Sequence, residues 1–327
     1  PLILVISALS ALLWHWKILK WITHGFGFLF QKTMGLGGAS ALAVAMSKIM
    51  TDDDPRFSLA PLETIQSADF AMLKTTLGDA LRQNRLEIAL VGDLDEDAAI
   101  AAVARSFGAL PKRVSDGKDQ NAQLQADWSA KRGNFDVPHN GEANQLAWRR
   151  IWTTTGDVDQ KTTQSMDLLA RVATLRLTDE LREKLGATYG VSANSDMSNL
   201  YLQRGTFSVS TAGDPKDIAV IETTVDQVIS ALVKSPVDSD LFERARKPVL
   251  ESYADWKKQN NTWLGVMAET QTNPDQLNRF RNSHSNFASI TAQDLWQLAK
   301  HYLDKPAEFT FRALPDEMVS AGAKSAE

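Results

Sequence analysis

A helix pattern followed by a β-rich run occurs twice in this chain, and this repeat limits the folds that the chain can adopt. Residues 65–77 (IQSADFAMLKTTL) and 290–303 (ITAQDLWQLAKHYL) share the order Ile-x-x-x-Asp-[Phe/Leu]-x-x-Leu. The offset is a constant 225 residues, from position 65 to 290 and from 69 to 294. In each copy an apolar trio lies on one helix face: Phe70, Leu73 and Leu77, and Leu295, Leu298 and Tyr302.

Each of these two helices precedes a run with strand character, LEIALVG at 86–92 and AEFTFRAL at 307–314. Thr291 and Asp294 form a capping-box pattern at the start of the second helix. Because helix and strand recur together, the repeat predicts two homologous domains.

Residues 144–315 divide into alternating patterns that predict one α+β domain. The expected strands are 144–155, 187–196, 199–213 and 307–314, and the expected helices are 162–186, 214–233, 239–259 (interrupted by Pro248) and 290–303. We expect a largely antiparallel sheet with helices packed on one face.

The first domain, 34–113, is expected to be incomplete. It has the later helices, the strand-like run and a helix at 95–108, but nothing before them corresponds to 144–213. Residues 114–143 are polar and contain turn residues, so we interpret most of this stretch as an interdomain linker. Residues 316–327 form a polar tail.

The segment 1–33 differs from the rest of the chain. Residues 2–14 are apolar apart from two serines, shorter than the roughly 20 residues that span a bilayer. Four interpretations are open: a signal-like or membrane anchor, part of a membrane span, a buried helix, or sequence foreign to the domains that follow. The sequence begins at Pro1, which is expected of a fragment or a processed form.

Composition excludes several classes of function. The chain has 35 basic and 40 acidic residues, a net charge of −5, and no basic stripe, so we expect no nucleic-acid partner. It contains no cysteine, which excludes disulfides and thiolate metal sites but does not fix the compartment.

Several stretches together resemble one known family. LREKLGATYGV, GTFSVSTAGDP, FERARK, VGDLDEDAAIAAVARSFGALPKR and HNGEANQ are similar to segments of the C-terminal, non-zinc half of pitrilysin/insulinase-family zinc metallopeptidases. The resemblance covers about residues 34–315. It implies four homologous α+β domains in the whole enzyme, arranged as two bowls that close on a peptide.

The resemblance also assigns roles to two residues. In the family, the first domain carries an H-x-x-E-H zinc motif, and the fourth contributes an arginine and a tyrosine that face the zinc. Their spacing matches Arg182 and Tyr189. Arg182 would bind a substrate carbonyl or carboxyl group, and Tyr189 would donate a hydrogen bond to the developing oxyanion. The alternative is a solvated arginine on a helix face and a tyrosine that fills the sheet.

For the two side chains to converge, the helix must end and reverse close to Gly186. Glycine adopts the left-handed conformation that permits such an end. We therefore expect Gly186 to be left-handed, and the side chains of Arg182 and Tyr189 to point into one concave surface.

The zinc motif itself is missing from this sequence. Among the five histidines, His139 comes nearest, with Glu142 in place but Ala143 where the second histidine should stand. We therefore expect no cofactor in this chain, zinc in a missing catalytic half or partner, and no peptidase activity of the chain alone.

Three hypotheses for the function follow. The chain is the substrate-binding half of a zinc metalloendopeptidase, a non-enzymatic partner or structural subunit of the same fold, or a membrane-anchored interaction module that uses residues 1–30. The expected partners are a peptide substrate and a zinc-carrying half or subunit. By resemblance, the expected location is the periplasm or the membrane of a bacterium. The peptide sequence and the oligomeric state do not follow from the sequence.

Overall fold

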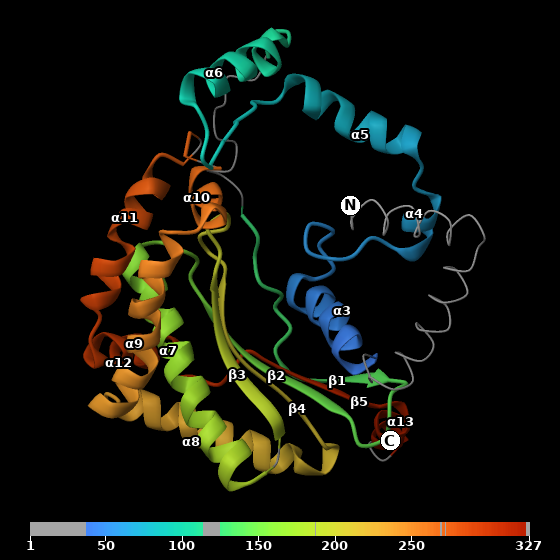
Figure 1. Ribbon diagram of the computed structural model, residues 1–327. Coiled ribbons are helices and arrows are strands. Elements are labelled where there is room, and N and C mark those ends of the chain that lie inside the picture. Colours follow the sequence, from blue (N-terminus) through green and yellow to red (C-terminus); the bar gives the residue numbers. More distant parts are fainter. Residues whose placement is uncertain (1–36, 114–124, 187, 269, 272, 325–327) are drawn as a thin grey trace, which may run out of the picture.

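A computed structural model describes residues 37–113, 125–186, 188–268, 270–271 and 273–324, and the earlier expectations for residues 1–33 lie outside this part (Figure 1). The strands are β1 (Gly133–His139), β2 (Leu146–Thr154), β3 (Thr188–Met197), β4 (Gly205–Gly213) and β5 (Phe309–Pro315). The helices before the sheet are α3 (Gly37–Thr51), α4 (Leu62–Ser67), α5 (Phe70–Gln83) and α6 (Glu96–Arg105). The later helices are α7 (Gln160–Leu177), α8 (Ile218–Lys234), α9 (Ser239–Trp256), α10 (Asn260–Met267), α11 (Asp275–Ala288), α12 (Ala292–Leu303) and α13 (Asp316–Lys324).

The five strands form one sheet in the order β1-β5-β2-β4-β3. Neighbouring strands are antiparallel except β1 and β5, which are parallel. The α+β class and the largely antiparallel sheet are confirmed. Several elements differ in detail from the prediction: β4 begins at Gly205 and not at 199, the helix expected at 162–186 is α-helical only to Leu177, and α9 continues through Pro248.

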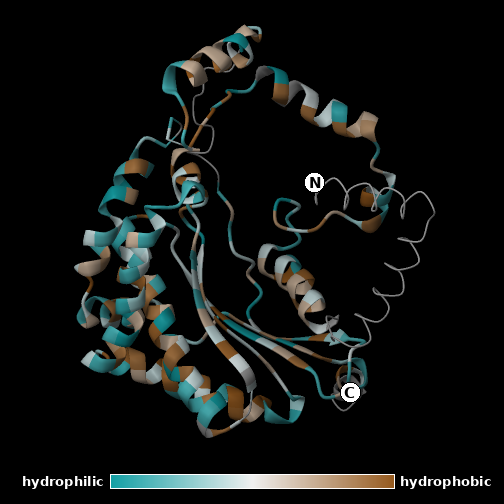
Figure 2. Cartoon of the chain, in the orientation of Figure 1, coloured by the Kyte–Doolittle hydropathy of each residue, from teal (hydrophilic) through white to brown (hydrophobic). Residues whose placement is uncertain are grey.

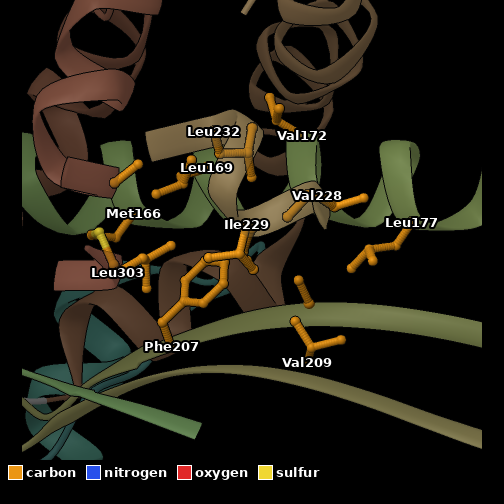
Figure 3. Packing of buried hydrophobic residues seen from close by; sticks show 14 of the residues in the cluster. Met166, Leu169, Val172, Leu177, Phe207, Val209, Val228, Ile229, Leu232 and Leu303 are labelled. Atoms are coloured by element: carbon orange, nitrogen blue, oxygen red, sulfur yellow. The ribbon is translucent and has the colours of Figure 1, made fainter. Parts of the chain in front are cut away.

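The main core lies between the sheet and the helices α7, α8, α9 and α12. Figure 3 shows side chains of α7 and α8 meeting those of β4: Met166, Leu169, Val172, Leu177, Val228, Ile229, Leu232, Phe207 and Val209. Every second residue of a strand faces these helices, since side chains alternate between the two faces of a sheet. At roughly 25 cal/mol per Å² of buried apolar surface, this cluster is the main source of stability.

The two copies of the repeated helix have opposite environments. In α12, Leu295 and Tyr302 are buried against α7 and α8, and Thr291 and Asp294 form the predicted capping box. In α5 the corresponding trio is exposed, and Phe70 retains 79% of its accessible surface. Figures 1 and 2 show α5, with its apolar positions, standing apart from the sheet. In the part of the chain that the structure describes, no helices cover α5 as α7 and α8 cover α12.

The prediction of a strand at 86–92 is wrong. These residues form no strand in the structure, and among the described residues 37–113 the regular elements are all helical. A strand needs a neighbour to accept and donate its backbone hydrogen bonds. Among the described residues, no strand lies beside 86–92 to pair with it.

The prediction that most of 114–143 is a linker is wrong for residues 133–139. These residues form β1 and pair with β5 along its whole length, from Gly133 with Phe309 to His139 with Pro315. Phe135 stacks on Phe311 with ring centroids 5.2 Å apart. In the sequence, the apolar residues Phe135 and Val137 alternate with polar ones inside a longer polar stretch, so no strand is predicted there. The division of the chain into domains otherwise stays a prediction.

We expect backbone amides at 86–92 to exchange with deuterium faster than those at 309–315. The second segment is paired on both sides by β1 and β2, whereas the first lies in no sheet. Hydrogen exchange followed by mass spectrometry measures the difference, and equal protection of the two segments would contradict this account.

Two strand glycines provide a matched test of packing. A Cβ atom on Gly205 would overlap the carbonyl oxygen of Thr155 and the hydroxyl of Thr154, whereas one on Gly190 would meet nothing within 4 Å. Gly205→Ala should therefore lower the free energy of unfolding by roughly 1–3 kcal/mol. Gly190→Ala should leave it nearly unchanged. Urea denaturation compares the two variants, and equal midpoints would show that the turn before β4 can relax.

Candidate functional site

Arg182 lies on the last helical turn before β3. After α7 the chain continues as a π-helical turn, Thr178–Lys184, which packs against β3. Leu181 of this turn is fully buried in the main core, and Arg182, the next residue, is exposed. The turn is thus anchored by its leucine, with the arginine outside the core.

The reversal at Gly186 is as predicted. This glycine has φ = +61°, in the left-handed region, and apart from its chain neighbours no atom of the described residues lies within 4 Å of where its Cβ would be. A residue with a side chain would be strained here, because L-residues rarely adopt positive φ. Two residues later the chain enters β3 at Thr188.

Tyr189 is the second residue of β3 and lies at an irregularity that the sequence did not predict. Thr188 pairs with Gly213 and Gly190 with the adjacent Ala212, so Tyr189 is an extra residue opposite β4. Such bulges change the direction of a side chain relative to its strand. The structure describes the backbone of Tyr189 and not its side chain, so the convergence of Arg182 and Tyr189 stays a prediction.

The sheet face opposite the main core is divided into two halves of different chemistry. On β1, β5 and β2 it is apolar: Phe135, Val137, Phe309, Phe311, Ala313, Ala147 and Ile151. On β4 and β3 it is polar: Thr206, Ser208, Ser210, Ser192, Asn194 and Asp196. We call this whole surface the open face.

Helix α3 covers only the apolar half of the open face. Leu42 and Met50 are buried there with the sheet residues, and Met46 and Ile49 pack beside them. In Figure 1, α3 lies across the sheet from α7 and α8. A groove of about 700 Å³ remains between α3 and the polar half, and Ala39, Met46, Gly190, Ser192 and Ser210 are among its lining residues.

Two adjacent arginines of β2 point to opposite faces of the sheet. Arg150, on the core side, forms ion pairs with Asp226 and Glu222 of α8 and donates to the Thr310 hydroxyl at 3.2 Å. Arg149, on the open face, lines the groove and donates through Nη2 to the Ser208 hydroxyl at 2.9 Å. Its Nε is buried without a hydrogen-bond partner among the described residues.

The electrostatic environment of Arg149 is therefore unusual. Burial lowers the pKa of its guanidinium, and the negative charge of Asp196 partly opposes this. An arginine nevertheless remains charged in proteins. Asp196 also lines the groove, is exposed, and forms no ion pair with Arg149 in the described part of the chain. Arg149 was not among the residues predicted from the sequence, where only the strand alternation with Trp148 and Arg150 indicates that it lies on the open face.

A stacked arginine joins the segment that follows α3 to the β3–β4 connection. Arg204 is buried, with its guanidinium carbon 4.2 Å from the ring centroid of Phe57 and 3.9 Å from that of Trp128. Its Nη1 donates to the carbonyl of Asp127 at 3.1 Å. Three distant stretches of sequence thus meet at one cation–π stack, and all three residues line the groove beside α3.

His139 has a structural role in this fold. Its Nδ1 accepts a hydrogen bond from the Gly141 amide at 2.9 Å, and its Nε2 lies 3.0 Å from the carbonyl oxygen of Gln145. Both ring nitrogens thus hold the connection from β1 to β2. Among the described residues no three His, Asp or Glu side chains are grouped so that they could hold a metal ion.

Comparison with known proteins supports the fold and the family. A family model described as "Peptidase M16 inactive domain" matches residues 69–249, more than half of the chain. No curated protein matches the sequence significantly.

Solved structures share the fold at low sequence identity. A peptidase M16 inactive domain from Pseudomonas fluorescens is 19% identical with a TM-score of 0.66, and the match covers 91% of this chain and 70% of that one. A mutant of the ferredoxin protease FusC, in complex with Arabidopsis ferredoxin, is 15% identical with a TM-score of 0.67 over 85% and 30%. The periplasmic protease PqqL from Escherichia coli is 15% identical with a TM-score of 0.55 over 68% and 24%. The present chain thus spans less than a third of the length of the last two proteins.

Proposed function

Because this chain belongs to the peptidase M16 inactive-domain family, we propose that it is the substrate-enclosing, non-zinc half of a zinc metalloendopeptidase. The family match agrees with the resemblance found in the sequence motifs. The proposal is that the chain binds and orients a peptide, while a zinc-carrying half or partner subunit supplies the zinc-activated water that hydrolyses it.

The corner from Arg182 to Tyr189 is the observation that carries this proposal. It combines an exposed arginine on an anchored turn, a left-handed Gly186 and a bulge at Tyr189. Gly190, the next residue, lines the groove of the open face, so the corner lies at one end of a surface that could receive a peptide. A cation and a phenol at such a place can bind a peptide carbonyl and a developing oxyanion.

Two other hypotheses have less support. A purely structural subunit of the same fold needs neither the corner nor the groove. A membrane-anchored module depends on residues 1–30, which lie outside the described residues, and in the described part no helix is long and apolar enough to cross a membrane. For location we propose the bacterial periplasm, following the periplasmic protease PqqL.

The isolated chain should not cleave peptides, and adding a zinc-carrying M16 half should produce cleavage that EDTA abolishes. The reason is that each chain would supply a different part of one site. A quenched fluorescent peptide library measures turnover with each chain alone and with the mixture. EDTA-sensitive cleavage by this chain alone would contradict the proposed division of roles, and an inactive mixture would favour the structural subunit.

In the reconstituted enzyme, Tyr189→Phe should lower kcat by about 10²–10³, as expected for the loss of one oxyanion donor. The melting temperature should hardly change, because the ring is kept. Arg182→Ala should reduce kcat/KM and weaken peptide binding. The matched control is Arg171→Ala, which replaces an exposed arginine on α7. It should leave kcat/KM and peptide binding unchanged. Full activity of Tyr189→Phe would contradict the catalytic role and would mean that Arg182 and Tyr189 have structural roles only.

A further inference from the structure

The open face contains a cation, Arg149, whose hydrogen-bonding capacity is only partly used by the described residues. A guanidinium carries five N–H donors and no acceptor. Of these, Arg149 uses Nη2 on Ser208, and its Nε is buried without a partner in the described residues. Leaving a buried charged donor unpaired costs free energy, and Arg149 lines the groove, so an acceptor that enters the groove would meet the guanidinium.

We propose that the groove between α3 and the polar half of the open face binds a carboxylate of an extended peptide, with Arg149 as the residue that pairs with it. This inference rests on the proposed function in one respect, that the ligand is a peptide. It adds a subsite on the sheet itself, separate from the corner of Arg182 and Tyr189.

The position of Arg149 in the strand register supports this assignment. On the open face it lies in one row with Ser210 of β4 and Ser192 of β3. Both serines line the groove and are partly exposed, so their hydroxyls can donate to or accept from a peptide backbone beside the charged pair. The row thus offers one cation and two adaptable polar groups.

The charge of the groove favours a single carboxylate over a polyanion. Asp196 lies on β3 four residues beyond Ser192, roughly 13 Å at the rise of a strand. It is exposed and negative, so it would repel a second nearby anion. Arg204, the other arginine in the lining, already faces two aromatic rings and a carbonyl. Nucleic acid or polyphosphate therefore fits this surface poorly.

The opposite wall suits side chains of a varied sequence. It is formed by α3, with Leu42, Met46 and Met50. Methionine side chains are flexible and polarisable, so they adapt to different apolar partners. A groove of about 700 Å³ is in the range of sites that bind small ligands or short peptide segments.

Fluorescence anisotropy on the full chain tests the proposal with short fluorescein-labelled peptides of Ala, Leu and Ser. Two matched pairs are compared. In the first pair, one peptide ends in a free carboxylate and the other is amidated. In the second pair, both peptides are amidated, and one has an internal Glu where the other has Gln. We expect the free terminus or the Glu peptide to bind at least about tenfold tighter than its neutral match, the size of one charge-assisted hydrogen bond. Whichever peptide shows this preference identifies the source of the carboxylate.

Arg149→Gln should abolish the preference and leave the affinity for the neutral peptides unchanged. Arg149→Lys should keep part of the preference, since it retains the charge without the planar fork. Arg171→Gln is the matched control. Far-ultraviolet circular dichroism and thermal melting check that each variant is folded.

Gly190→Trp tests the groove itself, because a Cβ at this position meets open space. This variant should lose all peptide binding, whereas Gly265→Trp on α10, where a Cβ also meets nothing within 4 Å, should bind normally. Peptide binding with no carboxylate preference, or a preference that survives in Arg149→Gln, overturns the subsite and leaves the proposed function standing. Binding of none of the peptides overturns both.

Discussion

The structure depends on one constraint: an apolar helix face has to be covered by other elements before it stabilises a fold. In the C-terminal part of the chain, α7 and α8 provide that cover for α12, and the sheet completes the core beneath them. The same helix pattern occurs in α5, where no such cover exists in the described residues, and its apolar trio is exposed. Identical local patterns therefore end in opposite environments, because propensity selects a helix and packing partners decide whether it is buried.

The sequence predicted what depends on local pattern. The helices, the antiparallel strands, the capping box at Thr291 and the left-handed Gly186 all follow from residue types within a few positions of each other. The prediction from sequence failed where a partner distant in the chain decides whether a segment forms a strand. Residues 86–92 have strand composition but no neighbour, while 133–139 have a polar context and a neighbour in β5.

The candidate site also combines features that follow from local sequence with features that depend on partners distant in the chain. Arg182 and Tyr189 are candidates because their spacing matches that of a family that the sequence resembles, whereas the bulge at Tyr189 appears only in the register between β3 and β4. Residue type alone does not single out Arg149, because its neighbour Arg150 is also an arginine. Strand alternation separates the two: one pairs with carboxylates on α8, and the other enters the groove.

The two halves of the open face explain how one sheet can serve both stability and recognition. The apolar half is covered by α3 and contributes buried area, so it has to stay closed. The polar half gains little from burial, since hydroxyls and charges lose hydration when they are covered. It can therefore remain accessible at small cost, and the stack of Arg204 with Phe57 and Trp128 lines the groove at the edge of this half. A peptide in this groove would contact the wall of α3 on one side and the row of Arg149 on the other, with the corner of Arg182 and Tyr189 beyond Gly190. The stability of the sheet is thus what holds the two proposed contact points at a constant separation.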